Sequence, residues 1–366
     1  MPELRLVKGN EAICYGALHG GCDAFFGYPI TPQNEVPEIM SWLMPKYGRF
    51  FLQAESELAS INMIYGAAGV GKRTMSSSSS PGISLMMEGL SYIAGAELPC
   101  VLINVQRGGP GLGNIAPSQS DYFQAVKGGG HGDYNNIVLA PWNAQELYDH
   151  PRIAFDLADK YRVPIIVLTD AVLGSMLEPA QIPEEPPPIE VPPKPWAACG
   201  RGGRAHRNVI NSLYLEPEVL SDHNDKLQAV YRTITENEKR WDTRLVDNAE
   251  FLVVAYGICS RIGFSAAKLA RERGLKVGLF RPVTLWPFPS EALNEIMQRV
   301  SGALVFELSG GQMVEDVRLA APGRPVEFFG KMGGVVPSPE QLCNEIFKAA
   351  EHCNAGSSSR TNRMCV

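Results

Sequence analysis

Three polar residues stand where apolar segments give way to helices or loops: Thr31, Glu57 and Arg107. Thr31 lies in FFGYPITP (25–32), between an apolar run and a helical pattern, and Arg107 follows the apolar run 101–105. A threonine hydroxyl and free backbone N–H groups at such a junction can bind a ligand, and a planar guanidinium matches a carboxylate. The set would suit a small anion that carries a carboxylate.

Each of these residues also has a purely structural interpretation. Thr31 could serve only as the N-cap of the helix that follows it. Glu57 falls in the first turn of its predicted helix, where the macrodipole alone favours an acid. Arg107 could lie on a solvated loop. A shared site is favoured because all three would lie at the carboxyl edge of one parallel sheet, where ligands bind.

The elements that must position these residues alternate between strands and helices over the first 180 positions. This alternation predicts a doubly wound parallel α/β sheet. Asn10 is expected to cap the first helix, and the serine run 76–80 is expected to form a tight turn lined with hydroxyls. Strands are expected at 23–27, 49–53, 73–76, 100–105, 137–140 and 163–168.

A proline-rich stretch at 179–195 separates this unit from the rest, since neither a helix nor a central strand tolerates so many prolines. A helix-prone segment follows at about 216–241, and a second, smaller α/β unit begins at Glu250. Its strands are expected in FLVVAYG, KVGLF, ALVFEL and VEFFG. The expected division of the chain is 1–180, a linker and helical wrap at 181–247, 248–354, and a disordered tail at 355–366.

Composition excludes several classes of protein. The chain has 366 residues, 45% of them hydrophobic, and a formal net charge of −6, which disfavours nucleic acid and anionic membranes as partners. No segment approaches the roughly 18 to 20 apolar residues that span a bilayer, and the N-terminus lacks a hydrophobic signal core, so a cytoplasmic protein is expected. The eight cysteines form no CxxC, which disfavours a metal site built by this chain alone.

Two nucleotide-binding patterns fail on their context. GAAGVGK at 66–72 satisfies GxxxxGK, but Arg73 stands where a P-loop has Ser or Thr, and the segment follows a helix rather than a strand. The loop GGPGLG at 108–113 is not a GxGxxG fingerprint, so a nicotinamide site has no support.

Ten strings, in order along nearly the whole chain, resemble the alpha subunit of the 2-oxoacid:ferredoxin oxidoreductases, and most of all its branched-chain (2-oxoisovalerate) type. They are GNEA (9–12), GYPITPQNE (27–35), AESELA (54–59), SSSSPGISLM (77–86), NVQRGGPGLG (104–113), GGGHGDY (128–134), NVINSLYLEPE (208–218), AYGICSR (255–261), RPVTLWPFP (281–289) and ELSGGQM (307–313).

The resemblance implies a thiamine diphosphate pyrimidine-binding domain followed by a smaller transketolase C-terminal-like α/β domain. It places the cofactor glutamate at Glu57, whose carboxylate would meet the pyrimidine N1′ and favour the imino tautomer. It assigns substrate binding to Thr31 and Arg107 and implies that they act in catalysis together with Glu57. The implied cofactor-binding residues are Glu57, Tyr28, Pro29, Ile30 and Thr31.

The same resemblance implies oxidative decarboxylation of a 2-oxo acid with coenzyme A, giving acyl-CoA, CO₂ and electrons for ferredoxin. Thiamine enzymes hold the diphosphate and Mg²⁺ through a GDG motif, which is absent here; the nearest string is HGDYNN at 131–136. A beta subunit should therefore bind the diphosphate and Mg²⁺, and gamma and ferredoxin-like delta subunits should carry the 4Fe-4S clusters. This chain would form half of the active site.

The alternatives that stay open concern substrate and class. Pyruvate or 2-oxoglutarate could replace 2-oxoisovalerate; 2-oxoglutarate needs a second cation, a role that Lys127 or a partner residue could fill. LGSM at 173–176 departs from the LGQM associated with branched-chain relatives. Other classes are an E1-beta-like transketolase-family component and a non-catalytic binding subunit.

Overall fold

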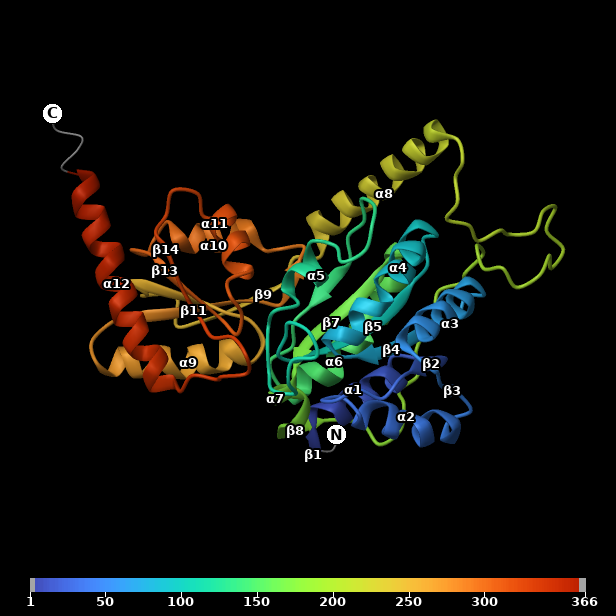
Figure 1. Ribbon diagram of the computed structural model, residues 1–366, viewed down its shortest axis with the longest axis horizontal. Coiled ribbons are helices and arrows are strands. Elements are labelled where there is room, and N and C mark those ends of the chain that lie inside the picture. Colours follow the sequence, from blue (N-terminus) through green and yellow to red (C-terminus); the bar gives the residue numbers. More distant parts are fainter. Residues whose placement is uncertain (1–3, 362–366) are drawn as a thin grey trace.

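The computed structural model describes residues 4–361, and it forms two α/β units that lie side by side (Figure 1). The first contains a seven-stranded sheet in the order β12-β6-β7-β5-β4-β2-β3. Every neighbouring pair in it is parallel except β12 with β6. Its strands are β2 (Ala24–Gly27), β3 (Phe50–Gln53), β4 (Thr74–Ser78), β5 (Cys100–Gln106), β6 (Ile137–Leu139), β7 (Pro164–Asp170) and β12 (Thr284–Trp286).

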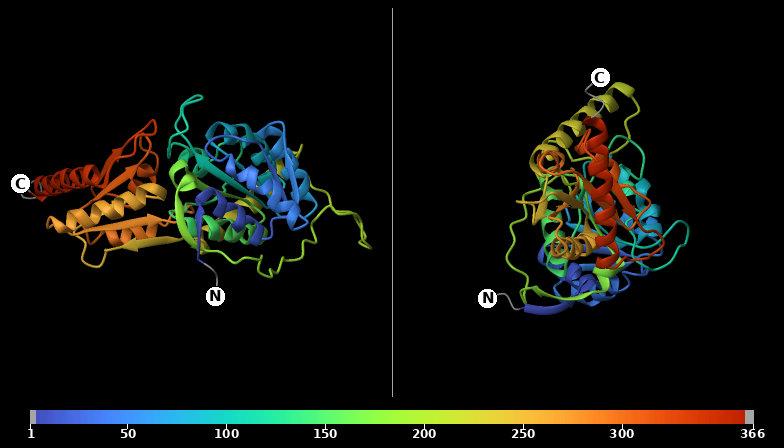
Figure 2. Two further views of the ribbon diagram at one scale, coloured as in Figure 1. Left: turned by 90° about the horizontal axis from the view of Figure 1, so that it is seen from below. Right: turned by 90° about the vertical axis from the view of Figure 1, so that its left-hand side faces the viewer.

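The central strands of this sheet are buried on both faces, as their uninterrupted apolar runs require. Helices cover both faces (Figure 2), so the expected doubly wound arrangement is confirmed. The helices are α1 (Gly9–His19), α2 (Glu35–Lys46), α3 (Glu57–Gly69), α4 (Ser80–Gly95), α5 (Tyr122–Val126), α6 (Ala144–Tyr161) and α7 (Ala171–Ser175).

Two local expectations in this unit are wrong. Asn10 does not cap α1, because the N-cap position is Lys8. The Asn10 amide instead donates to the Pro32 carbonyl at 3.1 Å and to Glu35 Oε2 at 3.0 Å, which ties α1 to the start of α2. The serine run does not form a turn: its first three residues complete β4, and Ser80 begins α4. Pairing of these three serines with β5 overrides the weak strand preference of serine.

The proline-rich stretch begins inside a strand. Leu4–Lys8 (β1) pairs antiparallel with Leu177–Gln181 (β8), and Pro179 lies opposite Leu6 in this two-stranded ribbon. Proline is tolerated there because the ribbon has no further strand beside it. Residues 182–216 contain no helix or strand and run as an extended segment to α8 (Pro217–Asn237) (Figure 1).

The second unit has a five-stranded sheet in the order β14-β13-β10-β11-β9. Three strand pairs in it are parallel, and the edge strand β9 runs antiparallel to β11. Its strands are β9 (Trp241–Arg244), β10 (Phe251–Val254), β11 (Val277–Pro282), β13 (Ala303–Glu307) and β14 (Val326–Gly330), and its helices are α9 (Gly257–Glu272), α10 (Ser290–Met297), α11 (Met313–Ala320) and α12 (Pro339–Thr361).

The end of the chain differs from the expected disordered tail at 355–366, because α12 continues to Thr361. Residues 362–366 of that tail lie outside the described residues.

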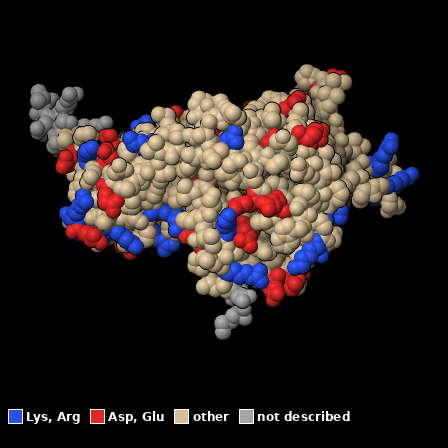
Figure 3. Space-filling model, turned by 60° about the horizontal axis from the view of Figure 1, so that its bottom comes forward, with Lys and Arg blue, Asp and Glu red and all other residues tan. Residues whose placement is uncertain are grey.

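Acidic and basic side chains are interspersed over the face drawn in Figure 3. Within residues 4–361, no helix is long and apolar enough to cross a membrane.

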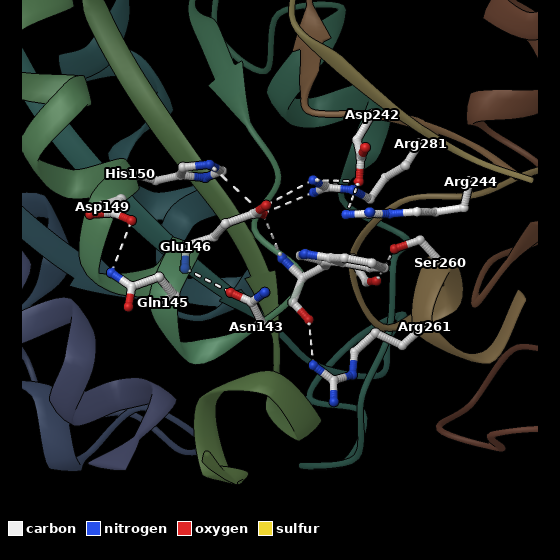
Figure 4. A network of polar contacts seen from close by, with 12 residues as sticks. Asn143, Gln145, Glu146, Asp149, His150, Asp242, Arg244, Ser260, Arg261 and Arg281 are labelled. Carbon is white, nitrogen blue, oxygen red and sulfur yellow. Dashed lines mark hydrogen bonds and ion pairs between the residues drawn. The ribbon is translucent and has the colours of Figure 1, made fainter. Parts of the chain in front are cut away.

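The two units are joined by a crossing strand and by an ion-pair network. β12, from the second half of the chain, pairs with β6 of the first sheet. Beside it, both terminal nitrogens of Arg281 in β11 donate to the Glu146 carboxylate in α6, at 2.7 and 2.8 Å (Figure 4). The guanidinium also stacks 4.6 Å from the centre of the Trp142 ring. We call Arg281, Glu146, Trp142 and their neighbour His150 the junction network.

Candidate active site

Thr31 lies in the turn between β2 and α2, at the carboxyl end of a strand, where the sequence places it. It is not an N-cap, because α2 begins four residues later at Glu35. Its hydroxyl oxygen accepts a hydrogen bond from the Asn34 side chain at 3.0 Å. The threonine therefore belongs to a turn stabilised by its own side chains. The preceding residues Tyr28, Pro29 and Ile30 are partly or fully exposed in the same turn.

Glu57 is the first residue of α3, and only 3% of it is exposed to solvent. The helix start is capped by Ser56, whose hydroxyl accepts from the Ala59 N–H. Ser78, at the end of β4, donates its hydroxyl to Glu57 Oε1 at 2.9 Å. A Cβ placed on Gly82 of α4 would lie 2.1 Å from that same oxygen. Glycine at this position is thus what leaves room for the carboxylate.

Arg107 follows β5 directly and is 7% exposed. One terminal nitrogen donates to the backbone oxygen of Thr31 at 2.9 Å, and the other donates to the backbone oxygen of Leu112 at 3.2 Å. Its Nε has no hydrogen-bond partner among the described residues. The guanidinium is held by neutral carbonyls alone within that part of the chain, so its charge stays available to an anionic ligand.

The serines of β4 and α4 connect these three residues. Ser77 donates to Gln33 in the turn that carries Thr31, Ser78 donates to Glu57, and Ser80 accepts from the Arg107 N–H at 3.0 Å. The structure therefore brings Thr31 into direct contact with Arg107, and it links Glu57 to the same edge through neighbouring serines. The motif SSSSPG carried a signal for this role: a run of hydroxyls directly before a proline that can open a helix.

Two further polar residues at this edge were missed from the sequence. Asn104, in β5, accepts from the Ser80 N–H at 3.3 Å and donates to Asp121 at 2.9 Å. Burial raises the pKa of the Asp121 carboxyl above its ordinary value, and the hydrogen bonds from Ser80 and Asn104 oppose this rise. These contacts fix the start of α4 against the strand that ends in Arg107.

The site fits the pyrimidine half of a thiamine cofactor. A buried carboxylate with a single side-chain donor and a glycine beside it can take a proton-bearing ring nitrogen as a further partner. No group of three or more His, Cys, Asp or Glu side chains suited to a metal ion occurs in the part of the chain that the structure describes.

The arrangement of the two α/β units identifies the fold class. Two successive α/β units of this kind align with a split-gene transketolase, solved as an inactive beta4 tetramer, with a TM-score of 0.58 and 14% sequence identity over 94% of this chain and 98% of the other. That likeness shows a transketolase-like fold and nothing more.

The family follows from the sequence models. Residues 15–241 match the thiamine diphosphate-binding domain of pyruvate flavodoxin/ferredoxin oxidoreductases, and residues 249–342 match core domain II of pyruvate:ferredoxin oxidoreductase. The chain therefore belongs to the 2-oxoacid:ferredoxin oxidoreductase family, whose members are oxidoreductase subunits.

Individual relatives span a range of similarity. The ketoisovalerate oxidoreductase subunit VorB of Methanothermobacter thermautotrophicus is 52% identical over 330 residues, covering 90% of this chain and 93% of that protein. The 2-oxoglutarate synthase subunit KorA of the same organism is 36% identical, with 95% and 99% covered. The 2-oxoglutarate:ferredoxin oxidoreductase of Magnetococcus marinus, solved with 2-oxoglutarate, coenzyme A and succinyl-CoA bound, aligns with a TM-score of 0.87 and 27% identity. This chain covers 65% of that one.

Proposed function

We propose that this chain is the alpha-type subunit of an enzyme that oxidatively decarboxylates a branched-chain 2-oxo acid, with 2-oxoisovalerate as the preferred substrate. Coenzyme A would take the acyl group, CO₂ would leave, and the electrons would pass to ferredoxin. The proposal rests mainly on one observation: the buried Glu57 lies at the same sheet edge as Arg107, whose guanidinium donates a hydrogen bond to the Thr31 backbone oxygen. The 52% identity to a ketoisovalerate oxidoreductase subunit supports the choice of substrate.

Each of these residues would have a separate role in binding or catalysis. Bound thiamine diphosphate supplies the carbanion chemistry that cleaves the bond between a keto carbon and its carboxylate. Glu57 would hold the proton at the pyrimidine N1′, in a buried position where an ion–dipole contact is strong. Arg107 would bind the substrate carboxylate, and the Thr31 hydroxyl would bind the carbonyl oxygen. Tyr28, Pro29 and Ile30 would line the cofactor.

The site would be completed by partner subunits. We propose a beta subunit that binds the diphosphate and Mg²⁺, and gamma and ferredoxin-like delta subunits that carry the 4Fe-4S clusters. The lack of a GDG motif in this sequence and of a metal-ligand cluster within residues 4–361 supports this division. The cytoplasm is the proposed location, and the domain limits 1–180, 181–247 and 248–354 are proposed with it.

An open pocket of about 600 Å³ beside Thr31 has a mostly apolar lining, which suits a substrate with an apolar side chain; neither Arg107 nor Glu57 lines it. Its two charged residues, Lys8 and Glu35, form an ion pair with each other, so the Lys8 charge already has a counter-charge in the pocket. Lys127, the other cation considered for such a role, is paired with Asp316. The pocket is lined by Lys8, Thr31, Pro32, Glu35, Ile115, Pro117, Ala171, Val172, Ser175 and Met176.

The test is purification of the chain with its native partners without oxygen, followed by viologen reduction with coenzyme A and a panel of 2-oxo acids. We expect a GDG-bearing chain and an iron–sulfur protein to co-purify, and kcat/KM to be highest for 2-oxoisovalerate. A higher value for 2-oxoglutarate would contradict the substrate assignment. A preparation with no thiamine diphosphate and no 2-oxo acid-dependent turnover would overturn the proposed function in favour of a non-catalytic binding subunit.

A further inference from the structure

The glycine-rich loop that begins at Arg107 is attached to the second α/β unit through Asn114. We propose that Asn114 is a positioning residue: it lets the loop at 331–334 hold the Arg107 guanidinium in the orientation that binds the substrate carboxylate. The inference rests on the proposed function of Arg107 and adds a role for the second unit at the active site.

The loop from Arg107 to Ala116 closes on itself through backbone contacts. The Gly108 N–H donates to the Ala116 oxygen at 2.9 Å, and the Asn114 N–H donates to the Gly108 oxygen at 3.0 Å. The Asn114 side-chain oxygen accepts from the Ala116 N–H at 3.0 Å. One Arg107 nitrogen donates to the Leu112 oxygen within this loop and the other donates to the Thr31 oxygen, so the loop conformation sets one of the two contacts that orient the guanidinium.

Large side chains do not hold the loop in place. Leu112 is 83% exposed and Ile115 is 62% exposed, so neither packs into the core. The backbone is also of a kind that needs glycine: Gly113 has φ +59°, and a Cβ on it would lie 1.7 Å from the Gly108 oxygen. A loop of this composition has many accessible conformations, and contacts from outside add to its internal hydrogen bonds in selecting one of them.

The outside contact comes from residues more than 200 positions further along the chain. The Asn114 amide donates to the Gly333 oxygen at 3.0 Å, in the loop that follows β14. Next to it, Gly334 has φ +89°, and a Cβ there would lie 2.2 Å from the Cβ of Ala116. One hydrogen bond at Asn114 and one close approach at Ala116 thus hold the end of the loop against the second unit.

Substitutions at Asn114 separate the two bonds of its side chain. Asn114→Asp keeps an oxygen for the Ala116 N–H but cannot donate to Gly333, whereas Asn114→Ala loses both bonds. Gly334→Ala pushes the two loops apart from the opposite side. Asn211→Ala is a matched control, because the Asn211 side chain closes a similar turn with Leu213 in the exposed segment 182–216.

The measurements are steady-state kinetics and backbone hydrogen exchange on the assembled enzyme. We expect Asn114→Asp, Asn114→Ala and Gly334→Ala each to raise KM for the 2-oxo acid about threefold to tenfold, with a smaller change in kcat and unchanged thiamine diphosphate content. Exchange should become faster in both loops, 108–116 and 331–334, and Asn211→Ala should leave KM and both loops unchanged.

Wild-type kinetics and loop exchange for Asn114→Asp would show a purely local turn and overturn the proposal. Faster exchange in 108–116 alone would overturn it as well, because the second unit would then not be coupled to the loop. If the wild-type enzyme turned over no 2-oxo acid, the proposed function would fall, while the exchange pattern would still decide whether the second unit holds the loop.

Discussion

Arg107 and Arg281 are both buried guanidiniums, yet their surroundings are opposite. Arg281 makes a bidentate ion pair with the Glu146 carboxylate and stacks on Trp142, so the junction network supplies its counter-charge. The terminal nitrogens of Arg107 meet only backbone carbonyls among the described residues. The Nε of each arginine lacks a partner there, so the two differ in their counter-charge. A buried charge with its own counterion is structural, whereas one held in place without a counterion is poised for an anionic ligand.

The largest loss of activity is expected at the active-site edge from Glu57→Gln, which keeps the shape of the side chain and removes its charge. Turnover should fall by about 10² to 10⁴-fold, since a general acid–base group contributes on that scale. Viologen reduction with saturating 2-oxo acid measures it. Glu55→Gln, on an exposed neighbour, is the control. Turnover within a factor of two of wild type would remove Glu57 from the mechanism.

The largest loss of stability is expected at the junction network. Arg281→Ala leaves the partly buried Glu146 carboxylate without its guanidinium partner and should lower the free energy of unfolding by about 3 kcal/mol, the lower end of the range for a fully buried pair. Urea titration of the purified chain measures this change. Arg107→Ala, which leaves no carboxylate behind, should cost much less. Equal losses from the two substitutions would mean that the carboxylate partner of Arg281 does not set it apart from Arg107 in stability.

A smaller effect on binding is expected from Arg107→Lys, which keeps the charge but loses the planar fork. KM for the 2-oxo acid should rise about tenfold to a hundredfold, since a hydrogen bond to a charged group is worth about 1.5 to 3 kcal/mol. Thiamine diphosphate content should not change, because Glu57 lies outside the Arg107 contacts. An unchanged KM would mean that the substrate carboxylate binds elsewhere.

The smallest of these effects is expected in how the free energy of unfolding depends on pH, through His150 of the junction network. His150 lies 3.9 Å from Glu146, but burial, followed by the charges of Arg281 and Arg240, lowers its pKa from 6.5 to about 3. It is neutral in the folded chain and takes up a proton on unfolding, so its share of stability is lost as the pH falls below 6.5. The loss should reach about 2 kcal/mol by pH 5.

His150→Gln should therefore weaken the decline in stability between pH 6.5 and pH 5, as followed by urea titration at each pH. His206→Gln, on an exposed segment, is the matched control and should leave the slope unchanged. An identical slope for wild type and His150→Gln would mean that the folded chain binds this proton as readily as the unfolded chain, so that burial does not keep His150 neutral.

The sequence predicted the parts of the fold that depend on local pattern. Strand and helix alternation placed Thr31, Glu57 and Arg107 at one sheet edge because such patterns fix which end of a parallel strand a loop follows. The serines were misjudged, since a strand made of serines is stabilised by its neighbours rather than by its own propensity. The role of Gly82 also depends on an approach between helices that no local signal reveals.

Elements formed by distant pairing were missed for the same reason. β1 and β8 pair across more than 160 positions, and β9 and β12 are short segments of four and three residues next to prolines or turns. Neither alternation nor length marks such segments as strands. Asn114 is a similar case, because its contact with Gly333 depends on how the two units meet.

The crossing strand β12 bears on the order in which the protein is made. While the ribosome has completed only the first 250 residues, β6 has no antiparallel neighbour and its backbone edge is exposed. The first unit can close that edge only after residue 286 has emerged. Nascent chains of intermediate length should therefore be the species most prone to aggregate, and expressing the two units as separate polypeptides should yield a first unit that depends on the second for solubility.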